Sequence, residues 1–269
     1  VRDDSIDPAF RALILQPPSQ SDIAQSLHER GHLPDPQKIY DAAETLTQTL
    51  AQQLADSLPR LYADTTVEGT YQPDAVSVGK RALNGRILSL LTRLDGGDQA
   101  SRQYDAADNM TQQYAALASL MKAENGESQS QAFFDQWQSD RLVMDKWFGL
   151  QAMSSRDDTL ARVKDLMSHP SFTMRNPNKV RSLIGAFAMA NPRHFHAADG
   201  SGYEFYTDRL IELDDINPQV AARLCAPLGK WAKYDDERAA KMKAALDRVL
   251  AKPEISRDLY EIASKSRAA

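Results

Sequence analysis

The sequence predicts an all-α protein, an irregular α-solenoid built of antiparallel helix pairs. Three observations support this class. Apolar residues recur at helical spacing from one end of the chain to the other. Period-two alternation beside tight hairpin turns, which would indicate strands, is nearly absent. The turns between the helical segments are short and polar, so consecutive helices must lie beside each other in opposite directions.

The first two long segments each have an apolar stripe and a clear boundary. Over residues 35–58, Asp35-Pro36 provides an N-cap and a first helical residue. The stripe of this segment consists of Ile39, Ala43, Leu46, Leu50, Leu54 and Leu58. A second stripe over residues 83–94 ends at Asp95-Gly96-Gly97, because glycine readily adopts the left-handed conformation that closes a helix.

Proline marks the boundaries of the later segments. Asn176-Pro177 opens a helix that runs through Phe187, and Asn217-Pro218 opens another that runs through Trp231. Pro227 lies inside the second of these, and we expect it to kink the helix because it removes one backbone hydrogen bond. A final pair of helices over residues 236–250 and 254–266 is separated by Lys252-Pro253.

These segments predict about a dozen helices, stacked as a HEAT/armadillo-like superhelix. The superhelix should be irregular, because the sequence shows no strict repeat at a fixed period. No stretch has the composition of a domain linker, so we expect a single helical domain over residues 1–269. The best loop candidates are residues 65–74 and 123–131.

Composition excludes several classes of protein. A net charge of −5 argues against nucleic-acid binding, which needs a basic surface to displace counterions. The apolar stretches, such as residues 183–190, are far shorter than the roughly 20 residues of a membrane-spanning helix. The lone Cys225 cannot form an internal disulfide and fits a reducing compartment, so we expect a cytoplasmic protein. Because the sequence does not begin with Met, we expect a fragment of a longer protein.

Residues 28–32 read His-Glu-Arg-Gly-His, the pattern by which many zinc peptidases bind their metal. The chemistry requires one continuous helix, because only then do both histidines point to one ion from the same face. Here Gly31 lies inside the motif and Pro34 follows it, so the helix should end before His32. A third ligand is also missing, since Glu44 and Asp56 lie at the wrong spacing. We therefore interpret the motif as polar residues at a helix end.

A second pair of histidines flanks Phe195 in the stretch His-Phe-His. Without a neighbouring cysteine or carboxylate cluster this is a weak metal signal. We expect Phe195 to pack inward and to leave His194 and His196 at a turn. In the same way, Trp147 and Tyr203 have the spacing of core residues, while Gly200 and Gly202 should permit a tight turn.

Several stretches of the sequence resemble the helical C-terminal domain of bacterial aminopeptidase N, in the gluzincin family of zinc metallopeptidases. They are LVMDKWFGLQA (142–152), SHPSFTMRNPNKVRSLIGAFA (168–188), FHAADGSGYEF (195–205), LDDINPQVAARLCAPL (213–228) and AADNMTQQYAALASL (106–120). The likeness continues more loosely to the start of the chain, so it covers nearly all of it.

This resemblance implies a non-catalytic domain of a zinc-dependent aminopeptidase, which removes N-terminal amino acids from peptides. The zinc helix and the substrate motif Gly-Ala-Met-Glu-Asn of the family lie upstream, and neither occurs here. We therefore expect no catalytic residue and no metal ligand in this chain, with the zinc held by the parent enzyme. The implied partners are the upstream catalytic domain of the same polypeptide and peptide substrates.

The resemblance also suggests how the domain acts. It would enclose the substrate chamber and contact the distal part of the peptide through Arg181, Gln219 and Arg223. A guanidinium group suits this task because it can pair with a carboxylate through two hydrogen bonds. Gln219 and Arg223 are four residues apart and should project from one helix face. Ion pairs on the surface or between helices are the alternative role for both arginines.

Two other functions remain open from the sequence. A free-standing α-solenoid could bind a partner protein along its concave face, as scaffolds of this architecture do. A self-contained zinc hydrolase could use His28, Glu29 and His32, but it would need a third ligand and an unbroken helix through Gly31.

Overall fold

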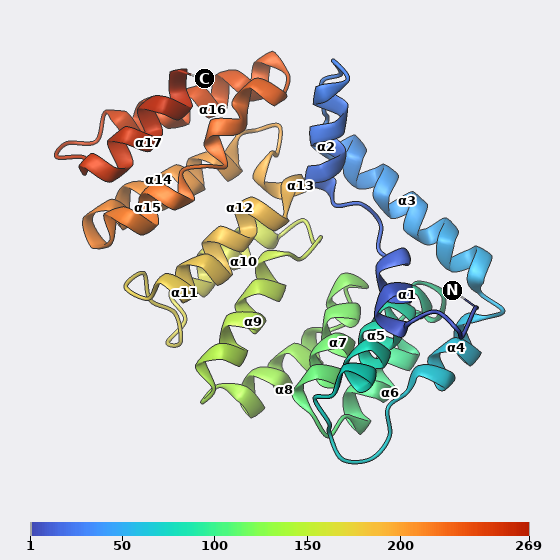
Figure 1. Ribbon diagram of the computed structural model, residues 1–269. Coiled ribbons are helices and arrows are strands. Elements are labelled where there is room, and N and C mark those ends of the chain that lie inside the picture. Colours follow the sequence, from blue (N-terminus) through green and yellow to red (C-terminus); the bar gives the residue numbers. More distant parts are fainter. Residues whose placement is uncertain (1, 269) are drawn as a thin grey trace. The chain divides into compact units, whose positions relative to one another are not determined.

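The computed structural model describes residues 2–268, and every regular element in this range is a helix (Figure 1). The all-α class that the sequence predicts is therefore confirmed. The elements up to the middle of the chain are α1 (Pro8–Ile14), α2 (Gln20–Glu29), α3 (Pro36–Leu54), α4 (Leu58–Thr65), α5 (Ala75–Asp95), α6 (Asp98–Ala106), α7 (Met110–Lys122), α8 (Glu127–Trp137) and α9 (Arg141–Ala152). None of the helices in residues 2–268 combines the length and the apolar character that crossing a membrane requires.

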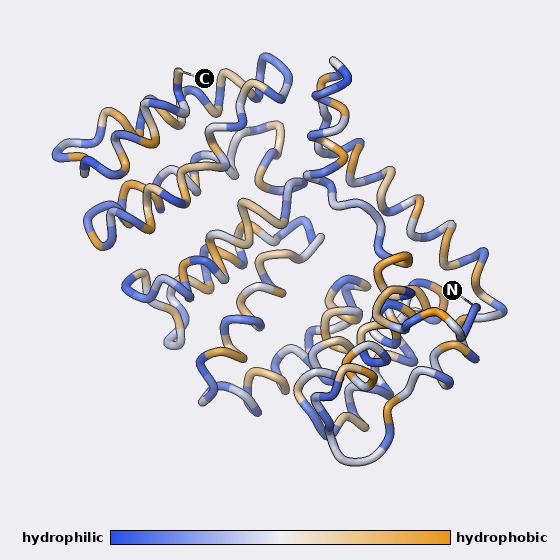
Figure 2. Tube along the Cα trace, viewed as in Figure 1, coloured by the Kyte–Doolittle hydropathy of each residue, from blue (hydrophilic) through white to orange (hydrophobic). Residues whose placement is uncertain are grey.

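The remaining elements include two short helices of other types. They are α10 (Thr159–Leu166), α11 (Pro177–Val180), the π-helix η1 (Arg181–Gly185), α12 (Ala186–Ala190), α13 (Pro192–Phe195), α14 (Ser201–Ile216), α15 (Pro218–Leu224), the 3₁₀-helix η2 (Leu228–Lys233), α16 (Asp236–Leu250) and α17 (Arg257–Ala268). Hydrophobic and hydrophilic residues alternate at helical spacing along α3 and along α14 to α17 (Figure 2), as amphipathic helices require.

Residues 2–268 form two compact units, one comprising residues 2–18 with Asp41–Asp135, the other Ser19–Tyr40 with residues 136–268. The first unit is organised around α5, against which α1, α4, α6 and α7 pack. One buried cluster of its core consists of Ala12, Leu15, Ala51, Leu58, Leu61, Leu83, Ile87, Leu90 and Leu91. The single domain over residues 1–269 that the sequence suggests stays a prediction.

Aromatic side chains form the core of the second unit. The ring of Phe195 meets the rings of Tyr203 and Tyr206 edge to face, with centroids 5.3 and 5.4 Å apart. Phe187 packs in the same way on Phe205 at 5.7 Å. The hydroxyl of Tyr206 donates a hydrogen bond of 2.7 Å to the backbone oxygen of Leu224, which connects α14 to α15. This core fixes the helices that carry the residues expected to bind substrate.

Several helix boundaries agree with those predicted from the sequence. Asn176 and Asn217 cap α11 and α15, each followed by a proline at the first helical position. Gly96, which closes α5, has a left-handed φ of 67°. Of the expected loops, residues 66–74 connect α4 to α5, whereas only residues 123–126 separate α7 from α8.

Two predicted helices are wrong in extent. The helix expected over 35–58 ends at Leu54, and Leu58 is the first residue of α4. Leu46, expected in the buried stripe of this helix, is 53% exposed. The helix expected through Trp231 ends at Leu224, and Pro227 precedes the separate 3₁₀-helix η2 instead of kinking a continuous helix.

Candidate functional site

Two of the three predicted substrate-binding residues line one shallow groove. Asn217 accepts a hydrogen bond from the backbone N–H of Val220 at 3.2 Å and so starts α15. The four-residue spacing then places Gln219 and Arg223 on one face of this helix. Helix α17 packs beside α15 and completes the groove. Its lining consists of Gln219, Ala222, Arg223, Ala226, Asp258, Glu261 and Ile262.

The guanidinium of Arg223 is available for a ligand. Its side chain is exposed, and within residues 2–268 no carboxylate lies within ion-pair distance of it. Glu261 across the groove instead accepts a 2.7 Å hydrogen bond from Lys265 on its own helix, which lowers the pKa of the Glu261 carboxyl. Arg223 therefore keeps donors that can pair with an incoming carboxylate. The sequence-based alternative of an ion pair for Arg223 does not occur in this part of the chain.

Arg181 lies outside this groove, at the start of the π-helix η1. Its side chain is exposed and donates a hydrogen bond of 3.2 Å to the side-chain oxygen of Asn178. A Cβ added to Gly185 would lie 3.8 Å from the Cβ of Arg181 and 3.5 Å from the side chain of Leu224. The η1 segment therefore packs against the end of α15. No sequence signal indicated the π-helix, a type that occurs often at functional sites.

The His-Glu-Arg-Gly-His motif does not form a zinc-binding face. Helix α2 ends at Glu29, and Gly31 has a left-handed φ of 78°, as the sequence predicts. The backbone N–H of His32 donates a hydrogen bond of 3.0 Å to the backbone oxygen of Leu27, so His32 lies past the end of the helix. Across residues 2–268, no three His, Cys, Asp or Glu side chains are grouped so that they could hold a metal ion. The residues present do not fit a zinc site.

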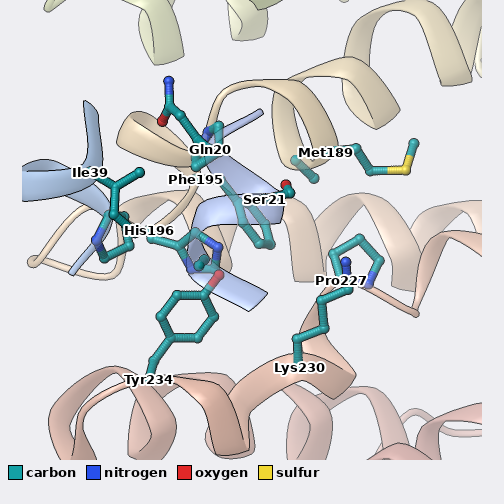
Figure 3. A pocket seen from close by; sticks show the side chains of 13 residues that line it. Gln20, Ser21, Ile39, Met189, Phe195, His196, Pro227, Lys230 and Tyr234 are labelled. Atoms are coloured by element: carbon teal, nitrogen blue, oxygen red, sulfur yellow. The ribbon is translucent and has the colours of Figure 1, made fainter. Parts of the chain in front are cut away.

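The second unit also contains a partly open cavity that the sequence did not indicate (Figure 3). His196 lies at a turn, as expected, whereas His194 lies within α13; the imidazole of His196 is buried, and its Nδ1 forms a 2.7 Å hydrogen bond with the hydroxyl of Tyr203. Burial lowers the pKa of His196 to about 3, and the positive charges of Arg238 and Lys230 add to this effect. Because α2, α3, α12, α13 and η2 all contribute lining residues, no local sequence pattern could have indicated the cavity.

Comparison with known proteins identifies the class of this fold. A family model described as a domain of unknown function (DUF3458_C) with ARM repeats matches residues 1–268. The chain belongs to this family, and the armadillo-like architecture that the sequence predicts is confirmed.

Its relatives include bacterial aminopeptidases. The chain is 42% identical to aminopeptidase N of Escherichia coli K12 over 272 residues, which is 99% of this chain and 31% of the relative. Aminopeptidase N of Haemophilus influenzae is 37% identical over 97% of this chain and 30% of its own length. The crystal structure of Legionella pneumophila aminopeptidase A in complex with aspartic acid superposes with a TM-score of 0.86 at 29% identity, over 98% of this chain and 32% of that one.

The chain thus spans about a third of the length of the relatives it matches. The resemblance to the helical C-terminal domain of aminopeptidase N is confirmed.

Proposed function

We propose that this chain is the non-catalytic helical domain of a zinc-dependent aminopeptidase that removes N-terminal amino acids from peptides. In this role it encloses the substrate chamber, and Arg223, Gln219 and Arg181 contact the distal part of the peptide. The zinc and the catalytic groups belong to the rest of the polypeptide, whose catalytic domain is the partner of this one. We place the enzyme in the cytoplasm.

The observation that supports this role best is the groove around Arg223. An exposed guanidinium without a carboxylate partner can form two parallel hydrogen bonds with the terminal carboxylate of a peptide. Gln219, on the same face, can bind a backbone amide of that peptide through its carboxamide. These groups bind and orient the substrate, and they transfer no proton. Their contribution should therefore appear in substrate affinity more than in turnover.

The test compares substrates that have a free C-terminal carboxylate with substrates that lack one. In the full-length polypeptide, Arg223→Ala should raise KM for an alanyl tripeptide with a free carboxylate by about ten- to a hundredfold, since a hydrogen bond to a charged group contributes roughly 1.5–3 kcal/mol. The same peptide with an amidated C-terminus, and a chromogenic alanyl amide, should change much less. Steady-state kinetics on the three substrates measures the difference.

Arg248→Ala is a matched control, because Arg248 is an exposed arginine on α16 that pairs with Asp208 at 2.6 Å, outside the groove. It should leave all three substrates unchanged. Equal effects of Arg223→Ala on the acid and the amide would contradict the carboxylate contact. Arg223→Lys should retain part of the affinity, because it keeps the charge and loses the bidentate geometry.

A further inference from the structure

The cavity beside His196 has the composition of a small-molecule site. It is lined by Phe195, Ile39, Met189 and three prolines together with Ala24 and Ala188, so more than half of its lining residues are apolar, and it opens to solvent beside the exposed Met189 and Lys230. Its volume of about 160 Å³ is similar to that of an engineered cavity of about 150 Å³ that binds benzene. A ligand with about six to eight non-hydrogen atoms therefore fits.

Besides Gln20, whose buried Oε1 is an acceptor without a partner in residues 2–268, three polar groups of the lining have unused hydrogen-bonding capacity. His196 is only 6% exposed and uses Nδ1 for the bond to Tyr203, which leaves Nε2 without a hydrogen bond in the described part of the chain. The ring of Tyr234 lies beside this imidazole, with centroids 4.2 Å apart, and its hydroxyl has no partner within residues 2–268 (Figure 3). Lys230 extends its ammonium from η2, and among the same residues it forms no ion pair.

These groups favour an anion. When the hydroxyl of Tyr203 donates to Nδ1, the proton of the neutral imidazole is on Nε2, so His196, Tyr234 and Lys230 all become donors. Burial is the main cause of the lowered pKa of His196; the positive charges of Arg238 and Lys230 add to it, and the carboxylate of Asp235, which pairs with Arg238 at 2.6 Å, opposes it. A carboxylate can accept hydrogen bonds from all three donors, and those from a charged donor such as Lys230 are the strongest, whereas an ammonium group can accept none.

We propose that this cavity binds a small apolar carboxylate, with the carboxylate held by Lys230, Tyr234 and His196 and the hydrocarbon part packed on Ile39 and Met189. This site is separate from the Arg223 groove, because the two share no lining residue. It does not depend on the proposed aminopeptidase role.

Binding can be measured with 4-methylpentanoate, whose eight non-hydrogen atoms match the cavity. The methyl group of Met189 provides the signal, because it lines the cavity and can be observed by NMR after ¹³C-methyl labelling of the eight methionines. We expect a saturable shift of this signal, assigned through Met189→Leu, with a Kd below about 1 mM. The uncharged 4-methylpentanamide and the zwitterion leucine should each bind at least about tenfold more weakly.

Two variants test the named contacts. Lys230→Gln should weaken 4-methylpentanoate binding about tenfold or more, and Tyr234→Phe, which keeps the ring against His196, about fivefold. Lys243→Gln is the control, because the Lys243 ammonium lies 3.6 Å over the Trp231 ring and outside the cavity. The proposal is overturned if the amide binds as tightly as the acid, if Lys230→Gln has no effect while its melting temperature is unchanged, or if no saturable shift occurs up to 20-fold above the expected Kd.

Discussion

At the scale of single residues, Gly202 allows α14 to approach the His194–His196 turn. A Cβ added there would lie 2.4 Å from the backbone oxygen of Phe195 and 2.6 Å from that of His194, both of which are backbone atoms that cannot rotate away. Gly202→Ala must therefore displace α14 from the aromatic core. We expect it to lower the free energy of unfolding by about 3 kcal/mol, the upper part of the range for overpacking, as measured by urea denaturation.

Gly149→Ala is the matched control in the same unit. Its added Cβ would meet nothing closer than 3.7 Å, and Gly149 lies within α9. Here alanine should stabilise the helix by up to about 1 kcal/mol, the difference in helix propensity between the two residues. Equal losses of stability in the two variants would contradict the contact that we describe for Gly202.

His196 should make the stability of the protein depend on pH. Its pKa in the folded state is about 3, because burial disfavours the charged form, whereas in an unfolded chain it is near 6.5. Below pH 6.5 the unfolded chain gains a proton that the folded protein does not bind until about pH 3. The free energy of unfolding is therefore unaffected by this group above pH 6.5. It decreases as the pH falls from 6.5 to about 3, by up to about 1.4 kcal/mol per pH unit.

Two measurements check the protonation state of His196 and its effect on stability. The imidazole NMR signals of His196 should remain those of the neutral ring between pH 7 and pH 5. His196→Gln should show a shallower loss of unfolding free energy over the same range than the natural protein. A midpoint near pH 6.5 for His196 in the folded protein would show that the ring is not buried.

The sequence predicts correctly the residues whose role depends on the local backbone conformation. It fails for residues whose environment is determined by contacts with distant parts of the chain. Gly31 and Gly96 have the left-handed conformation that their positions at helix ends indicated. His196 could not be distinguished from His194 by pattern, because its burial depends on Tyr203 and Tyr234, which come from other elements. The pairing state of Arg223 likewise depends on α17, more than thirty positions later in the chain.

At the scale of helices, α14 is joined to the segment between α16 and α17 by a buried carboxylate. The side chain of Asp214 is 1% exposed and pairs with Lys252 at 3.3 Å, whose side chain is 6% exposed. It also accepts hydrogen bonds from the backbone N–H of Ser256 at 3.0 Å and from the hydroxyl of the same residue. Asp214→Asn leaves a buried ammonium poorly compensated, so it should lower the free energy of unfolding by about 3–5 kcal/mol.

The neighbouring residue provides a stringent comparison. Asp215 pairs with the same Lys252 at 2.6 Å, but its side chain is 70% exposed. Asp215→Asn should therefore change the stability by less than about 1 kcal/mol, as is usual for exposed ion pairs. Chemical denaturation of both variants measures the difference, and a larger effect for Asp215 would mean that burial does not control the strength of this contact.

The end of α15 shows why helix extents were harder to predict than helix positions. The apolar spacing of Val220, Leu224 and Leu228 suggested one helix, and all three side chains are indeed buried. Pro227 has no backbone N–H, and its ring would clash with the carbonyl four residues earlier in a continuous helix. Helix α15 therefore ends before Pro227, and the separate helix η2 begins after it. The indole N–H of Trp231 fixes η2 by donating a 2.8 Å hydrogen bond to the backbone oxygen of Ser266.

At the scale of the whole molecule, the boundaries between the two units lie in unusual places. The chain passes from one unit to the other after Pro18, Tyr40 and Asp135. The second and third of these points lie inside α3 and α8 and not in loops. A boundary inside an intact helix keeps its backbone hydrogen bonds, whereas a boundary that behaves as a flexible linker exposes its backbone.

Limited proteolysis with chymotrypsin distinguishes these cases. Tyr71 lies in the loop between α4 and α5 and is 42% exposed, whereas Tyr40 lies within α3 at the crossing point. Because cleavage requires locally extended chain, the first cut should follow Tyr71. Mass spectrometry of the fragments identifies the cut. In Tyr71→Ser, cleavage after Tyr40 should proceed only as fast as α3 unfolds and should slow with stabilising osmolytes. Rapid cleavage after Tyr40 in the natural sequence would mean that α3 opens at the boundary and that the two units are separate domains.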